Sequence, residues 1–206
     1  MSKFACQFLP AFLHHLNDSD PVLKRIISHA QLCSLKPRKN YYPSLIQSII
    51  SQQLSVKAGE SIYKQFSAYF GKNVSPVHVA ATPVEKLREF GLSNAKAIYV
   101  KDLSEKILSN QLSFKNISKK SNDEIIDELT KVKGIGIWTA HMFLIFTLGR
   151  LDVLPVGDLG IKNAIKKNYR LKELPNESQI AALCKKKKWK PYQSIASWYL
   201  WMSLEL

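Results

Sequence analysis

The sequence is poor in cysteine, and the cysteines that it has do not form a metal or redox motif. Cys6, Cys33 and Cys184 are far apart, and no two of them form a C-x-x-C pair. The five histidines do not cluster with them in any spacing typical of zinc ligands. We therefore expect reduced cysteines that behave as small buried hydrophobic residues, and no structural zinc or disulfide.

Glycine, proline and long apolar runs are also scarce. Only 8 glycines and 9 prolines occur among 206 residues, which excludes a fibrous repeat and a disordered chain. No apolar stretch reaches the roughly 18 to 20 residues that a membrane span requires. The first segment, MSKFACQFLPAFLHHLNDSD, is a poor secretory signal because Pro10 and two histidines interrupt it. A globular chain without a membrane span is expected.

Acidic residues are outnumbered by basic ones. Sixteen Asp and Glu stand against 30 Lys and Arg, so the formal net charge at pH 7 is +14. Such a balance is typical of proteins that bind nucleic acid or another anionic surface. The net charge is a weak indication by itself, because many basic proteins only carry solvated lysine-rich faces.

Strand patterns are absent, and helical spacing dominates. Nowhere do apolar and polar residues alternate convincingly over five or six positions, so the fold class is expected to be all-α. One apolar stripe runs along a helix that Gly71 would end. The expected helix caps are Thr82 before Pro83, Ser93, Ser121 with Glu124, and Asp158. The polar segment 109–122 is expected to cross between two lobes.

The stretch KVKGIGIWTA places Gly134 and Gly136 one residue apart, directly before an expected helix. Glycines remove side chains from such a turn, and the helix that follows offers unpaired N–H groups to an anion. In a basic chain without a phosphate-binding P-loop, a DNA phosphate is the natural anion. The alternative is a plain hairpin between two helices, whose glycines only close the connection.

A longer stretch beginning at this hairpin, LTKVKGIGIWTAHMFLIFTLGRLDVLPVGDLGIKNAI, carries a known signature. It resembles the helix-hairpin-helix, Gly/Pro-rich loop and aspartate (helix-hairpin-helix-GPD) motif of base-excision DNA glycosylases, in the alkylbase branch of DNA-3-methyladenine glycosylase II. Three further segments agree in order: IISQQLSVKAG, GLSNAKAIYVKDL and WKPYQSIASWYLW. The resemblance extends from about residue 40 to the C-terminus.

The resemblance implies a two-lobed helical fold with the active site in the cleft between the lobes. One lobe would comprise residues from about 1 to 40 and from 122 to 206, and the other about 41 to 121. The catalytic residue would be Asp158, whose carboxylate stabilises the positive charge that develops on the deoxyribose. The alternative for Asp158 is a helix cap without a chemical role.

The resemblance also implies a pocket for a base that is flipped out of the duplex. Its aromatic walls would be Trp138 and Trp201, and Met142 stands where the family often has a tyrosine. Alkylated purines are cationic, so each ring stacked on one gains roughly 0.5 to 2 kcal/mol. Alternatively, these tryptophans only fill the core.

Trp138 also occupies the position where bifunctional relatives carry a nucleophilic lysine. The resemblance therefore implies a monofunctional enzyme that leaves an abasic site and has no lyase activity. Those relatives often bind an iron–sulfur cluster on four cysteines near the C-terminus, where this chain has only Cys184. We expect no iron–sulfur cluster and no organic cofactor.

Contacts to DNA are expected from two further segments. Gln53, with Ser55 as a second candidate, would fill the gap left by the flipped nucleotide, although these turn residues could instead be structural. The turn with Lys133, Gly134 and Gly136 would bind the DNA backbone. Hairpins of this family also hold a monovalent cation, Na⁺ or K⁺, and this one can do the same.

The expected function is release of alkylated purines, of the 3-methyladenine and 7-methylguanine type, from double-stranded DNA in base excision repair. The expected protein is a monomer, intracellular and not membrane-bound, located with the nucleoid in a bacterium or in the nucleus of a eukaryote. Two alternatives stay open. One is a non-catalytic helix-hairpin-helix module that binds damaged DNA, and the other is a glycosylase for deaminated, etheno or oxidised bases.

Overall fold

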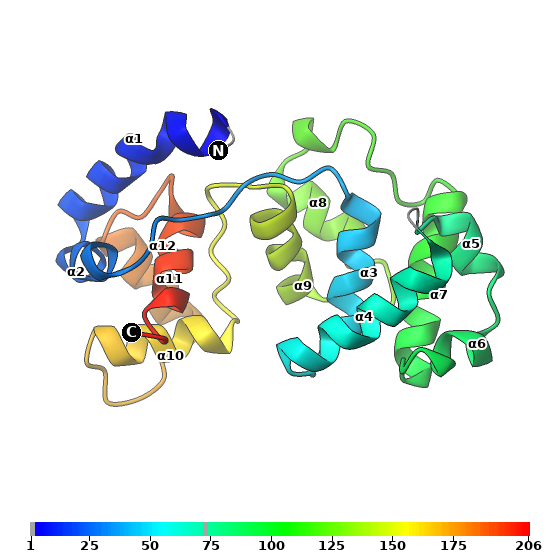
Figure 1. The fold of residues 1–206 in the computed structure, drawn as a ribbon. Helices are drawn as coiled ribbons and strands as arrows, with labels where there is room; N and C mark the ends of the chain where they lie inside the picture. The colour runs from blue at the N-terminus through cyan, green and yellow to red at the C-terminus, as the bar shows by residue number, and fades with distance from the viewer. Residues whose placement is uncertain (1–2, 72–73) are drawn as a thin grey trace. The chain divides into compact units, whose positions relative to one another are not determined.

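The computed structural model describes residues 3–71 and 74–206, and its regular elements are all helical (Figure 1). No strand occurs in that part of the chain, so the expected all-α class is confirmed. The helices form two units. The first unit contains residues up to 38 and from 144 to the C-terminus, and the second unit contains residues 39–143.

The first unit is built around a buried helix near the C-terminus. Its helices are α1 (Lys3–Ser19), α2 (Pro21–His29), α10 (Leu159–Asn168), α11 (Glu177–Lys186) and α12 (Gln193–Met202). All residues of α12 from Gln193 to Leu200 are buried, which is the pattern of a central helix rather than an amphipathic surface helix. α12 packs against α10 and also against α2, so the N-terminal helices complete this core.

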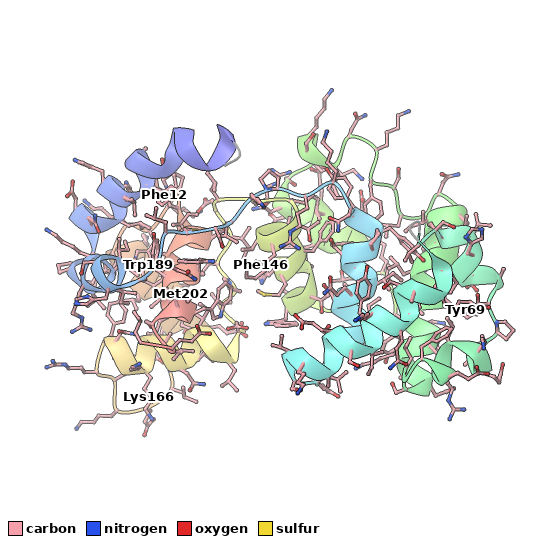
Figure 2. The ribbon with its side chains drawn as sticks, viewed as in Figure 1. Phe12, Tyr69, Phe146, Lys166, Trp189 and Met202 are labelled. Carbon is pink, nitrogen blue, oxygen red and sulfur yellow. The ribbon has the colours of Figure 1, made fainter. Side chains whose placement is uncertain are left out.

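A buried carboxylate joins distant parts of the first unit. Asp20 is fully buried and caps α2 by accepting a hydrogen bond from the Val22 N–H at 3.0 Å. Its other oxygen accepts from Trp189 Nε1 at 2.9 Å and from the Tyr169 hydroxyl, while Lys187 Nζ lies 3.8 Å from the carboxylate. Burial, together with the adjacent carboxylate, raises the pKa of Tyr169 far above its ordinary value. The hydroxyl therefore stays a donor to Asp20. Trp189 is labelled in Figure 2.

The second unit is arranged around α7. Its helices are α3 (Tyr41–Ser51), α4 (Val56–Phe70), α5 (Pro76–Ala81), α6 (Val84–Glu89), α7 (Asn94–Leu108), a 3₁₀ turn (Ile117–Lys119), α8 (Asn122–Leu129) and α9 (Ile137–Met142). α7 packs against α3, α5 and α6, and α8 packs against α9 (Figure 1). A π-helical segment, Phe143–Thr147, continues α9.

Most of the expected helix ends are confirmed. Gly71 ends α4 with φ +71°, Ser93 caps α7, and Ser121 with Glu124 forms the expected capping box. The cap expected at Thr82 is wrong. Thr82 follows the last residue of α5, and its hydroxyl donates to the His78 carbonyl at 2.8 Å. Pro83 precedes α6 instead and offers no side-chain cap.

The division into units differs from the one expected. The polar segment 109–122 stays inside the second unit, so it is not the crossing between lobes. The hairpin between α8 and α9 also belongs to the second unit, whereas the expected division places it with the C-terminal residues. The reason lies in its contacts with other parts of that unit. Lys133 N donates to Asp102 of α7, and the Gly134 carbonyl accepts from Gln52 at the end of α3.

Two of the cysteines are buried free thiols. Cys33 and Cys184 are each about 5% exposed, and burial raises the pKa of each thiol to about 11. At neutral pH both are therefore unreactive thiols, as we expected. The side chain of Cys6 lies outside the described part. None of the described helices has the length and hydropathy needed to cross a bilayer.

The substitution Asp20→Ala is expected to lower the free energy of unfolding by about 3 kcal/mol, because it leaves buried donors on Trp189 and Tyr169 unpaired. Urea denaturation measures the change. Asp18→Ala is the matched control, since Asp18 lies two residues earlier, near the end of α1, and is exposed. Its effect should stay within about 0.5 kcal/mol. Equal losses in the two variants would contradict the role given to Asp20.

Candidate active site

Asp158 is placed by the start of α10. It is only 8% exposed, and its Oδ1 accepts a hydrogen bond from the Ile161 N–H at 2.8 Å. The expected capping role is therefore confirmed. The same position puts the carboxylate at the positive end of the α10 dipole, which stabilises its negative charge. A cap and a chemical role are compatible at this position.

Trp201 brings the end of α12 to the same carboxylate. Its indole Nε1 donates a hydrogen bond to Asp158 Oδ1 at 2.9 Å. One carboxylate oxygen thus accepts from a backbone N–H of α10 and from an indole N–H of α12. The sequence placed both residues in the site through the resemblance, but it contained no signal for this direct contact.

Gly160 makes the contact between α10 and α12 sterically feasible. A methyl group added to it would lie 3.0 Å from Asp158 Oδ1, 3.0 Å from Trp201 Cδ1 and 3.1 Å from Trp201 Nε1. The absence of a side chain in the first turn of α10 therefore gives the indole room beside the carboxylate. A glycine inside a helix is unfavourable by itself, and that cost was the signal in the sequence that could have identified Gly160.

Phe146 is a neighbour of Trp201 that sequence reasoning missed. Its ring centroid lies 5.5 Å from that of Trp201, with an angle of 32° between the ring planes. It lies on the π-helical segment after α9 and is labelled in Figure 2. The sequence held no signal for it, because the π-helical segment changes the direction of the side chains that follow α9.

The two glycines of the hairpin have different surroundings. Gly134 adopts φ +79°, and a methyl group on it would lie 2.1 Å from Tyr99 Cδ2. Gly136 is exposed with an extended backbone, and a methyl group on it would meet no protein atom within 4 Å. Packing within the protein therefore requires Gly134, whereas the space at Gly136 is open to an outside molecule. Lys133 is exposed and its Nζ lies 3.9 Å from Asp102 Oδ1.

The turn between α3 and α4 is tied to the hairpin. Gln52 Nε2 donates to the Gly134 carbonyl at 2.8 Å, so Gln52 has a structural role. Gln53 is exposed and has φ 55°, an uncommon backbone conformation for a residue other than glycine. Ser55 caps α4 by accepting from the Ala58 N–H at 3.3 Å. Gln53 is thus displayed by the turn, while the Ser55 hydroxyl is engaged in the cap.

Lys96 holds the same turn from α7. Its ammonium group donates to the carbonyls of Ile50 and Gln52, at 2.8 and 2.6 Å. Desolvation by burial lowers the pKa of Lys96 from its ordinary value. These two bonds satisfy carbonyls at the C-terminal end of α3, where a cation is favourable.

The remaining expected pocket residues belong to the second unit. Trp138, on α9, is 47% exposed, and Met142, one turn further along, is half-buried. Trp138 is therefore not core filler. The candidate residues thus divide between the units, with Asp158 and Trp201 in the first unit and Trp138 and Met142 in the second.

The described residues contain no group of three or more His, Cys, Asp or Glu that could hold a metal ion. A monovalent cation at the hairpin would require the turn carbonyls. That of Gly134 already accepts the hydrogen bond from Gln52.

Comparisons with known proteins show which family the sequence matches. The sequence pattern of the HhH-GPD superfamily base excision DNA repair proteins matches residues 46–191. The alkylbase DNA glycosidase-like protein mag2 of Schizosaccharomyces pombe is 35% identical over 193 residues, covering 91% of this chain and 90% of the relative.

Two solved structures have the same fold. The S. pombe 3-methyladenine DNA glycosylase Mag1, in complex with abasic DNA, superimposes with a TM-score of 0.85 at 31% identity, over 95% of this chain and 97% of that chain. A DNA-3-methyladenine glycosidase from Bacillus halodurans gives a TM-score of 0.81 at 34% identity, over 92% of this chain and 87% of that chain.

The two hairpin glycines make a matched pair of variants. Gly134→Ala is expected to lower the free energy of unfolding by about 2 to 4 kcal/mol, because the methyl group meets Tyr99 and the backbone is left-handed. Gly136→Ala should cost no more than about 1 kcal/mol, since its surroundings are open. Chemical denaturation of both variants checks this. Equal losses would show that the two glycines do not differ in this way.

Proposed function

This chain belongs to the HhH-GPD superfamily of base excision DNA repair proteins, as a glycosylase related to the 3-methyladenine enzymes, and we propose that it is a monofunctional alkylpurine DNA glycosylase. It flips an alkylated purine out of double-stranded DNA and hydrolyses the N-glycosidic bond. The products are the free base and an abasic site in an unbroken strand.

The observation that carries the proposal is the fixed Asp158 carboxylate, with two donors on Oδ1. As the bond between C1′ and the base nitrogen breaks, the bonding electrons leave with the base and positive charge develops on the sugar. A fixed carboxylate stabilises that charge in the transition state without reorganising. Water then adds its oxygen to C1′ and releases a proton to the solvent.

An alkylated purine suits this chemistry because it is already cationic. It leaves as a neutral base once it takes the bonding electrons, so no strong general acid is needed. The exposed indole of Trp138 offers an electron-rich ring on which such a cation can stack. Met142 stands one turn further along α9 and contributes an apolar side chain. The names of the relatives, alkylbase and 3-methyladenine glycosylases, support the same choice of lesion.

The proposed monofunctional character rests on Trp138. Lyase activity in this superfamily needs an amine that attacks C1′ and forms a Schiff base. An indole nitrogen has no basic lone pair and cannot do this. Water is therefore the nucleophile, and the strand stays intact after the base has left.

The proposed DNA contacts lie on the second unit. The space beside Gly136 is open, so backbone N–H groups at the start of α9 can bind a DNA phosphate there, and Lys133 adds a positive charge to the same turn. Gly134 shapes this turn through its packing on Tyr99. Gln53, displayed by its left-handed backbone, fills the gap that the flipped nucleotide leaves. Ser55 supports the turn as a cap.

Incubation with methylated double-stranded DNA tests the proposal directly. We expect free 3-methyladenine and 7-methylguanine in the supernatant, and strand breaks only after alkali treatment, because the abasic site is left uncleaved. Chromatography of the released bases and a denaturing gel measure the two results. Breaks before alkali would refute the monofunctional assignment. DNA binding without any released base would instead favour a non-catalytic damage-binding module.

The substitution Asp158→Asn separates the cap from the chemistry. Asparagine can still cap α10 but carries no charge, so base release should fall at least about 100-fold while melting temperature and DNA affinity are retained. Single-turnover kinetics with methylated DNA measure the loss. Glu173→Gln is the control, because it removes an exposed carboxylate from the same unit. Base release that survives in Asp158→Asn would rule out the proposed role.

A further inference from the structure

Phe146 is an exposed aromatic ring among buried neighbours. Its side chain is 37% exposed, whereas Phe143, Leu144, Ile145 and Thr147 of the same π-helical segment are all buried. π-Helical segments are rare in proteins, and many of those that occur lie at functional sites. Core packing explains the four buried neighbours, but it does not explain why a large apolar ring remains at the surface.

The ring of Phe146, although partly exposed to solvent, also contacts the ring of Trp201. The ring centroids are 5.5 Å apart and the planes are tilted by 32°, at a centroid distance that is favourable for two aromatic rings. Trp201 is only half-buried, so packing in the core does not fix it completely. The contact with Phe146 restricts the rotation of the indole about its side-chain bonds.

The orientation of the indole matters because its N–H holds the candidate catalytic carboxylate. Trp201 Nε1 donates to Asp158 Oδ1 at 2.9 Å, and hydrogen bonds weaken steeply when the donor angle departs from linearity. The backbone at Gly160 lies close to the edge of the indole that carries Nε1. Rotation of the indole would break the bond to the carboxylate or push the ring toward α10.

We propose that Phe146 is a positioning residue for the Asp158 carboxylate and that it acts through the Trp201 indole. This inference rests on the function proposed above and deepens it. Phe146 holds the indole, the indole N–H holds Oδ1, and the carboxylate keeps the position in which it stabilises charge on C1′. Trp201, which we had expected as a wall of the base pocket, thereby gains a role in the chemical step.

A double-mutant cycle tests whether Phe146 acts on Asp158 through Trp201. Phe146→Leu should lower the single-turnover rate constant of base release about tenfold, with the apparent dissociation constant for DNA unchanged, because a small misplacement affects the transition state more than binding. Trp201→Phe removes the donor and should lower the rate constant about 10- to 100-fold. The double variant should be as slow as Trp201→Phe alone, since Phe146 has no further route to the carboxylate.

Two further variants complete the experiment. Phe146→Tyr keeps the ring and should recover most of the rate lost in Phe146→Leu. Leu171→Ala removes an exposed apolar side chain elsewhere in the first unit and controls for surface changes.

The outcomes separate the two proposals. If the wild-type protein releases no base, the proposed function is wrong and this inference falls with it. If the wild type is active but Phe146→Leu keeps its rate, only this inference is wrong. Losses that multiply in the double variant, or a weaker apparent affinity with an unchanged rate constant, also overturn it. Phe146 would then act on the base directly.

Discussion

The close approach of α10 and α12 at Gly160 is the constraint on which the candidate site depends. Without a side chain at this position, the indole of Trp201 can reach the carboxylate at the start of α10. α12 is buried along most of its length, so its end is held firmly against that carboxylate. The burial of α12 and the lack of a side chain at Gly160 together determine the position of the Asp158 carboxylate.

The N-terminal residues have their own part in holding α12. α2 packs against it, and Asp20 links the start of α2 to Trp189, just before α12 begins. The described residues of α1 and α2, which carry no family motif, therefore contribute to the core of the unit that contains Asp158.

The second unit shows a comparable linkage between its own candidate residues. Lys96 binds the end of α3, Gln52 joins that end to the Gly134 carbonyl, and Gly134 packs on Tyr99. The turn that displays Gln53 and the hairpin that exposes Gly136 are thus parts of one hydrogen-bonded structure. Under the proposed function, Gln53, which fills the gap in the duplex, and the hairpin turn, which binds the DNA backbone, would keep a fixed distance from each other.

Local patterns in the sequence predicted local features well and long-range contacts poorly. Helix type, the capping box at Ser121 and the cap at Asp158 depend on residues a few positions apart, and all were found. The hydrogen bond between Asp20 and Trp189 joins residues 169 positions apart, and no periodicity signals such a contact. The predicted cap at Thr82 was wrong for a different reason. Two helices compete for it, and its hydroxyl serves the end of the first.

The same limit applies to the site. The resemblance named Asp158, Trp138 and Trp201 because motifs preserve residue identity, but identity does not specify which atoms meet. Phe146 was missed because the helix after Trp138 changes to a π-helical segment, which alters the direction of each later side chain. A regular helix through Thr147 would have been the natural assumption. The structure was needed to connect Phe146 with Trp201.

A glycosylase without a lysine nucleophile depends heavily on the position of its carboxylate. A carboxylate that acts by charge alone forms no bond to C1′, so it contributes only if it is held in place before the charge develops. Under the proposed function, Trp138 stands where bifunctional relatives carry the lysine, and Asp158 Oδ1 receives two N–H donors from two different helices. An indole on α9 and a doubly anchored carboxylate on α10 would then serve one mechanism, in which fixed charge and water replace covalent catalysis.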